Sequence, residues 1–298
     1  EAYEYYLRGR QLAGQTSETS WRHAPKMFRR AIELDPNYAQ ALAGLADSLA
    51  QQILWRFAPA TQVLPEASAA AAKALDLAPD LAEAHVAQGH IRSLAGDHEG
   101  AIRSFERAIA LNPSLQEAYY YFARHCYARG DNARAAELFQ QAFRVRPDEY
   151  VVLALSVGAL EGSGDRAGAD AMAQRAVTGL AHQSELDPEN ARLHYLAAGL
   201  LQRLGRGDEG RVCAERALRL RPDDFATLYN VACFYSLAGD CQRALDLLER
   251  ALSHGAGYYD WIMHDADLAA VRELPRFHQL LTQLRELPEP ELRNAPDQ

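Results

Sequence analysis

Two glycine-containing stretches have spacings that could serve phosphate chemistry. "GRQLAGQT" at residues 9–16 resembles a phosphate-binding loop, but Gln15 stands where that loop needs a lysine. "GRGDEG" at residues 205–210 has the G-x-G-x-x-G spacing of a dinucleotide site. Both motifs require a β-strand before the loop and a helix after it. Since no strand precedes either stretch, we predict neither a nucleotide site nor any other cofactor.

The sequence supports a metal site or a catalytic nucleophile no better than it supports a nucleotide site. His85 and His90 share one predicted helix, but a spacing of five residues places their side chains about 140° apart around the axis. The four cysteines are scattered without a C-x-x-C pair, so we predict reduced thiols, with neither a zinc site nor a disulfide framework. No nucleophile–base arrangement stands out. We therefore predict no metal ligands, no catalytic residues and no enzymatic activity.

Charge and hydropathy restrict the partners further. The 298 residues carry a formal net charge of −9, whereas phosphate backbones and anionic membranes select clustered lysine and arginine. No stretch approaches the roughly 18 apolar residues of a membrane span. We predict a cytoplasmic chain that binds neither nucleic acid nor membrane through this fragment.

A repeated helix junction dominates the rest of the sequence. "AIELDPNYAQALAGLA" returns as "AIALNPSLQEAYYYFA" and as "ALRLRPDDFATLYNVA". Each copy runs from an apolar helix end, through a proline, into a new apolar helix. The prolines that end these helices are Pro36, Pro79, Pro113, Pro147, Pro188 and Pro222. Three of the five intervals are 34 residues, and the other two are 43 and 41.

Small and aromatic residues recur in step with these prolines. One complete set is Ala123, Gly130, Asp131, Ala135, Phe139, Ala142 and Pro147. The order resembles the tetratricopeptide repeat, a pair of antiparallel helices with a 34-residue period. Small residues let two helices cross closely, the Gly-Asp pair ends one helix and caps the next, and proline ends the second. The resemblance covers roughly residues 5 to 258.

One helix pair cannot bury its apolar face, so such pairs must stack. We predict an all-α fold, a right-handed superhelix or solenoid of about seven helix pairs with a C-terminal cap. The predicted repeats are 5–38, 39–81, 82–115, 116–149, 150–190, 191–224 and 225–258. Seven extra residues in the fifth repeat predict a longer second helix. Residues 259–287 are predicted to form capping helices broken at Pro275, and residues 288–298 a disordered tail.

The resemblance also implies where a partner would bind. In this family the first helix of each repeat lines a concave groove, with positions 2, 5, 9, 12 and 13 facing it. The candidate partner-binding residues at these positions are Tyr120, Arg124, Tyr127, Arg192, Tyr195, Arg203 and Tyr229. Tyrosine and arginine dominate interface energies, and the guanidinium group recognises carboxylates. We predict a protein or peptide partner of acidic character. The alternative is that these side chains only cover neighbouring helices.

An insertion in the second repeat offers a second candidate contact. It contains Trp55 and Phe57. If these rings are exposed they mark a partner site, and otherwise they belong to the local core. Self-association through this insertion or through the terminal helices is a further alternative.

The two ends of the chain carry a narrower resemblance. The openings "AYEYYLRGRQLA" and "AIELDPNYAQALAGLADSLA", and the closing "GDCQRALDLLERALSHGAGYYDWIMHDADLAAVRELPRFHQLL", are similar to repeat arrays attached to bacterial signalling effectors. These effectors include winged-helix activators, adenylate cyclases and serine/threonine kinases. We therefore expect a non-enzymatic interaction scaffold, the regulatory part of a larger signalling or regulatory protein. The alternative is a fragment of a multidomain enzyme or transcription activator whose effector domain lies elsewhere.

Overall fold

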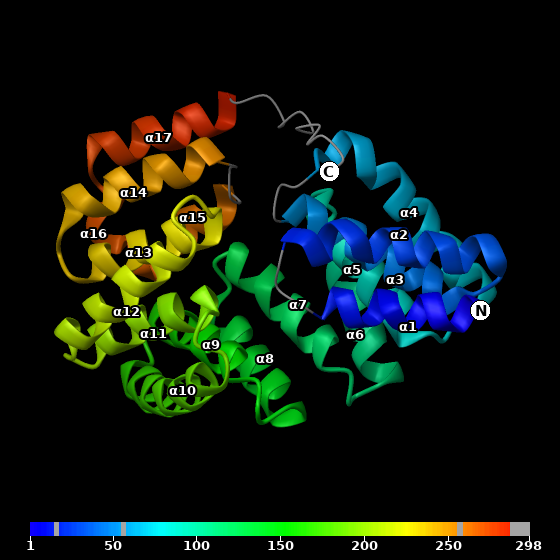
Figure 1. Cartoon of the computed structure of the whole chain (residues 1–298), viewed down its shortest axis with the longest axis horizontal. Helices are drawn as coiled ribbons and strands as arrows, with labels where there is room; N and C mark the ends of the chain where they lie inside the picture. Colours follow the sequence, from blue (N-terminus) through cyan, green and yellow to red (C-terminus); the bar gives the residue numbers. More distant parts are fainter. Residues whose placement is uncertain (15–17, 55–57, 255–258, 287–298) are drawn as a thin grey trace. The chain divides into compact units, whose positions relative to one another are not determined.

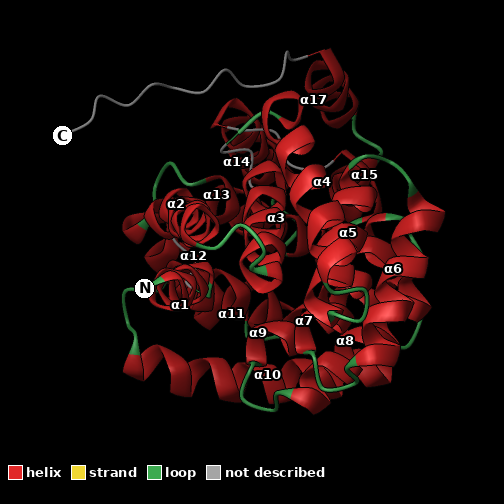
Figure 2. Cartoon of the chain, turned by 90° about the vertical axis from the view of Figure 1, so that its right-hand side faces the viewer, coloured by secondary structure: helices red, strands yellow, loops and turns green. Residues whose placement is uncertain are grey.

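The computed structural model describes residues 1–14, 18–54, 58–254 and 259–286 (Figure 1). Every regular element in these ranges is a helix, with loops between them (Figure 2). The first fourteen helices form seven successive pairs, so the predicted all-α repeat fold is confirmed. Trp55, Phe57 and the tail at 288–298 lie outside the described residues, and the predictions for them stay predictions.

The chain divides into two compact units, and the boundary falls inside helix α7, between Phe122 and Ala123. The helices of the first unit are α1 (Ala2–Ala13), α2 (Glu18–Leu34), α3 (Ala39–Leu54), α4 (Ala60–Leu77), α5 (Ala82–Leu94), α6 (His98–Leu111) and the start of α7 (Gln116–Ala128). In this unit α3 packs on α2, α4 and α5. The stacked pairs thereby share one core, as a repeat fold requires.

The second unit begins with the end of α7. Its pairs continue with α8 (Asn132–Val145), α9 (Tyr150–Gly162), α10 (Arg166–Leu186), α11 (Ala191–Arg203), α12 (Gly207–Leu220), α13 (Phe225–Leu237) and α14 (Cys241–His254). The described residues end with α15 (Tyr259–His264), the 3-10 helix η1 (Ala266–Leu268), α16 (Ala269–Arg272) and α17 (Pro275–Glu286). At 21 residues, α10 is the lengthened second helix expected of the fifth repeat.

Gly-Asp pairs make the turns within the helix pairs. Gly96, Gly130, Gly164 and Gly239 have φ between +78° and +87°, a left-handed conformation that favours glycine. The aspartate after each accepts a hydrogen bond from a backbone N–H in the first turn of the next helix. The sixth pair keeps the left-handed glycine, Gly205, but Arg206 replaces the aspartate and makes no such bond.

Removing one of these caps should weaken the fold measurably. Asp165 accepts a 2.9 Å hydrogen bond from the Gly168 N–H at the start of α10. We expect Asp165→Ala to lower the free energy of unfolding by about 1 kcal/mol. Urea denaturation followed by circular dichroism measures this loss. Asp170→Ala, on the exposed side of the same helix, is the control, and equal losses in the two variants would contradict the cap assignment.

Close helix crossings build the core of the first unit. A Cβ added at Gly89 would lie 2.8 Å from the Phe105 ring, and one added at Gly44 would lie 2.6 Å from Phe28. Both rings are buried. Gly89 therefore admits an aromatic side chain from the paired helix α6, and Gly44 admits one from α2 of the preceding pair. Larger residues at either position would force the helices apart.

The C-terminal helices join the core of the second unit. Helix α17 lies alongside α14, and α16 packs on α13 and α14 (Figure 1). Their apolar side chains Leu268, Val271 and Phe277 are fully buried. These contacts anchor the end of the array, as an open helical stack requires. None of the described helices is both long and apolar enough to cross a lipid bilayer.

Candidate functional site

Residues 259–272, which we call the inner segment, lie against the first helices of the pairs in the second unit. The inner segment comprises α15, η1 and α16. Its central part, η1, packs on α9 and α13, and α11 lies between these two and contacts both. The segment therefore covers the side chains that α7, α9, α11 and α13 present on this face.

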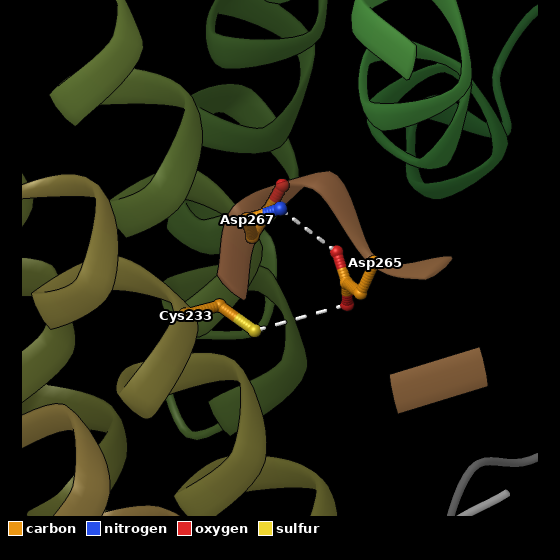
Figure 3. A group of neighbouring side chains, drawn as sticks. All are labelled: Cys233, Asp265 and Asp267. Atoms are coloured by element: carbon orange, nitrogen blue, oxygen red, sulfur yellow. Dashed lines mark hydrogen bonds between the residues drawn. The ribbon is translucent and has the colours of Figure 1, made fainter. Parts of the chain in front are cut away.

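Asp265 is the most enclosed polar residue of the inner segment, with 6% of its surface exposed. The Tyr229 hydroxyl donates to its Oδ2 at 2.6 Å, and the Tyr127 hydroxyl donates to its Oδ1 at 3.2 Å. The Asp267 N–H donates to Oδ1 at 3.0 Å, and the Cys233 thiol lies 3.9 Å from Oδ2 (Figure 3). Residues from α7, α13 and η1 thus converge on one carboxylate.

The second carboxylate of the inner segment meets a buried guanidinium. Arg203, at the end of α11, pairs with Asp267 and with Glu161 of α9. Only 7% of the Arg203 side chain is exposed. A fully charged group at this depth requires charged partners, because water is nearly excluded. Arg203 therefore joins two repeats to the inner segment.

An aromatic contact completes the set. The Trp261 ring lies 4.6 Å from the Tyr127 ring, between centroids, at an interplanar angle of 60°. The Arg124 guanidinium lies 4.7 Å from the centroid of the Trp261 ring, within the range of a cation–π interaction. Trp261, Asp265 and Asp267 therefore make the aromatic and polar contacts of the segment with this face, beside the apolar contacts of Ile262, Leu268 and Val271. We call their receptor, Tyr127, Arg203 and Tyr229, the carboxylate seat.

Burial determines the protonation of Asp265 and of the two tyrosines in the seat. It raises the pKa of Asp265 to about 6, and the charge of Asp267 acts in the same direction. Burial likewise raises the pKa values of Tyr127 and Tyr229 well above the usual phenol value, reinforced by the charge of Asp265. Both phenols therefore remain protonated hydrogen-bond donors at neutral pH.

Among the described residues, Cys233, Asp265 and Asp267 place three possible metal-ligand atoms within 4.8 Å of one another (Figure 3). The chemistry of the three groups fits a metal poorly. Burial raises the pKa of the Cys233 thiol well above its usual value, whereas a metal binds the thiolate. Asp265 already accepts three hydrogen bonds, and Asp267 already pairs with Arg203. The arrangement fits hydrogen bonding between two parts of one chain.

The structure brings together three of the predicted partner-binding residues, Tyr127, Arg203 and Tyr229, and Arg124 adjoins them through Trp261. Tyr195 is buried in the core between α11, α12 and α13. Arg192, also on α11, is half-buried. Tyr120 belongs to the first unit, where its ring lies 5.2 Å from the Tyr121 ring.

Sequence reasoning missed the residues that occupy the seat. Trp261, Asp265 and Asp267 were assigned to a C-terminal cap, and Glu161 was not singled out. The signal available in the sequence was the Asp-Ala-Asp stretch at 265–267, which interrupts two apolar helices. Two carboxylates inside an otherwise apolar terminal region indicate that basic or donor groups face them.

Fold and site together define an all-α repeat protein whose stacked first helices hold a peptide segment. The family model described as "Tetratricopeptide repeat" matches residues 94–156. A TPR repeat-containing protein of Methanocaldococcus jannaschii is 24% identical over 168 residues, which are 55% of this chain and 30% of that protein. The interferon-induced protein with tetratricopeptide repeats 3 of Mus musculus is 31% identical over 126 residues, 41% of this chain and 30% of that protein. Residues 94–156 therefore match a tetratricopeptide repeat, and the chain is similar to proteins that contain such repeats.

Solved structures agree on the fold. A monomeric mutant of IFIT1, solved with m7Gppp-AAAA, has a TM-score of 0.66 at 18% identity, covering 96% of this chain and 64% of its own. A tetratricopeptide repeat protein from Parabacteroides merdae has a TM-score of 0.52 at 14% identity, covering 95% of this chain and 98% of its own. At these identities the likeness concerns the fold alone. The matched part is 30% of the length of each of the two curated relatives above.

Proposed function

We propose that this chain is a non-enzymatic scaffold that binds an acidic protein or peptide through the first helices of its repeats. Proteins of this family generally serve as interaction scaffolds. One observation carries the specific proposal: the tyrosine and arginine side chains of α7, α11 and α13 already hold two carboxylates of an extra segment. This face of the second unit is therefore chemically suited to an acidic peptide.

The proposed partner-binding residues divide by their surroundings. Tyr127, Arg203 and Tyr229 supply carboxylate recognition, and Arg124 supplies a cation for an aromatic side chain. We also propose Tyr120, Arg192 and Tyr195 as contacts, because they occupy the groove-facing positions of their repeats. Tyr195 acts through the core that supports α11, since it is buried.

The same proposal makes the chain the regulatory part of a larger signalling or regulatory protein in the cytoplasm. The closing sequence that resembles effector-linked arrays includes the inner segment. The stretch that resembles effector-linked arrays is thus the same stretch that fills the seat. We expect this coincidence if filling the seat regulates an attached domain. Expression of the complete reading frame, with and without R203M, and assay of any domain attached to the array test this part of the proposal.

Peptide selection tests the scaffold proposal directly. A displayed random peptide library is panned on the full chain and on the variant R124E/R203E. We expect acidic peptides to be enriched on the full chain and lost on the variant, because the charge reversals repel carboxylates at the seat. The matched control is R206E/R250E, which reverses two exposed charges of the same unit.

Two results would count against the scaffold. One is equal enrichment of the same peptides on R124E/R203E and on the full chain. The other is binding of a capped RNA in preference to any peptide, the ligand class seen in the IFIT1 structure. We expect no such RNA binding, because the net charge of −9 opposes phosphate contacts.

A further inference from the structure

We propose that residues 259–267 of the inner segment are a tethered substitute for the partner, and that the partner displaces them with the pattern aromatic-x-x-x-Asp-x-Asp. This inference rests on the proposed function and specifies the peptide that the scaffold takes. In the chain itself the pattern is Trp261, Asp265 and Asp267, spaced by four and by two residues.

Each of the three side chains of the pattern contacts a different set of groups on the first helices. Trp261 meets an aromatic ring and a guanidinium. Asp265 meets two phenol hydroxyls from helices in different repeats, and Asp267 meets Arg203. Capping the end of a helical stack requires only apolar cover, which Leu268, Val271 and Phe277 already supply. The polar recognition is therefore additional to the capping role.

The apolar anchors of the C-terminal region lie mostly outside residues 259–267. The fully buried apolar residues of the C-terminal region begin at Leu268 and continue through Val271 to Phe277, apart from Ile262 in α15. These residues pack on α13 and α14 and hold α16 and α17 in place. Release of residues 259–267 also withdraws Ile262, which is 1% exposed, and the partly buried Tyr259 and Met263 from this core. Leu268 to Phe277 stay in place and keep the end of the array covered. The polar contacts that must break are those that a partner with the same pattern would replace.

The free energy of burying a carboxylate also favours displacement of the segment. Placing a carboxylate at a buried position carries a desolvation cost, which the hydrogen bonds offset only in part. The contact between the segment's carboxylates and the seat is therefore specific, but a partner peptide can replace it. A tethered ligand competes at an effective concentration near the millimolar range. An incoming peptide must therefore bind the seat more tightly than the segment does, and the resting chain discriminates against weak acidic peptides.

A fluorescent peptide that spans residues 259–272 is the probe. Its binding is measured by anisotropy with the full-length wild-type chain and with D265A/D267A, whose own segment holds the seat less well. We expect D265A/D267A to bind the peptide about tenfold more tightly, or better, because the tethered competitor is weakened. A peptide with asparagine in place of the aspartate that corresponds to Asp267 should bind both chains more weakly, because it lacks the charge that pairs with Arg203. Adding R203M to D265A/D267A should abolish binding of the original peptide.

A second variant guards against a folding defect. W261A removes the aromatic contact but keeps both carboxylates, so we expect a smaller gain in peptide affinity than in D265A/D267A. Circular dichroism confirms that each variant remains helical. Unchanged peptide affinity in both variants would overturn the inference and leave the inner segment as a fixed part of the fold. The library selection described above would still stand, because it tests acidic peptides of any pattern.

Exchange between copies of the chain is the competing outcome. If the segment of one copy fills the seat of another, the wild-type chain should dimerise at micromolar concentration and D265A/D267A should not. Sedimentation velocity at several concentrations distinguishes the two cases. Such dimerisation would overturn the assignment to an external partner, and a monomeric wild-type chain supports it.

Discussion

Replacing Arg203 with methionine should lower the free energy of unfolding by about 3–5 kcal/mol, the usual loss when one partner of a buried ion pair is removed. The Arg203 side chain is 7% exposed and pairs with both Glu161 and Asp267. Methionine fills much of the same volume but leaves two carboxylates without a counter-charge. Chemical denaturation of the full chain, followed by circular dichroism, measures the loss.

The matched control is Arg206→Met, three residues further along. Arg206 pairs with Glu209 at the surface, where its side chain is 41% exposed. Exposed pairs contribute about 0–1 kcal/mol. The prediction therefore concerns the difference between two arginines of one repeat. A loss in R203M no larger than that in R206M would show that the network around Asp267 contributes little to stability.

The stability of the second unit should also depend on the protonation of Asp265. Its pKa in the folded chain is about 6, against an ordinary value of 3.8. Because folding raises this pKa, the stabilisation is complete at low pH and is lost as the pH rises through about 6. The two values correspond to a change of about 3 kcal/mol. We expect this loss between about pH 4 and pH 7.

Asp265→Asn isolates this effect from the other groups that titrate in the same range. The amide keeps the shape of the carboxyl group without its ionisation. The free energy of unfolding of the wild-type chain, minus that of D265N, should therefore fall by about 3 kcal/mol across this range. The phenols of Tyr127 and Tyr229 stay protonated throughout, since burial raises their pKa values. A difference that does not vary with pH would contradict the prediction, and D267N tests whether the neighbouring carboxyl is responsible instead.

The repeat architecture was predictable because it is encoded locally. The 34-residue spacing of prolines and the Gly-Asp pairs each act within one helix pair, and the structure shows the expected left-handed glycines and aspartate caps. Placing tyrosine and arginine on the first helices likewise needed only the position within the repeat. Tyr127, Arg203 and Tyr229 could thus be selected without knowledge of their surroundings.

The occupant of the seat was not predictable by the same means. Tyr127 and Asp265 are 138 residues apart, and the terminal segment has no repeat register that would place it. The sequence indicated two amphipathic helices after residue 258 and correctly marked Leu268, Val271 and Phe277 as apolar positions. Which face of the array the intervening carboxylates meet depends on how several repeats stack, and a local pattern does not contain that information.

Helix repeats are usually gained and lost freely in evolution, because each contacts only its neighbours. The inner segment removes that freedom from the second unit, since Tyr127, Glu161, Arg203 and Tyr229 belong to the fourth, fifth, sixth and seventh pairs. Duplicating or deleting a pair between α7 and α13 would separate groups that now meet at Asp265 and Asp267. We therefore expect homologues that retain the Asp-x-Asp stretch to keep the same number of helix pairs between α7 and α13.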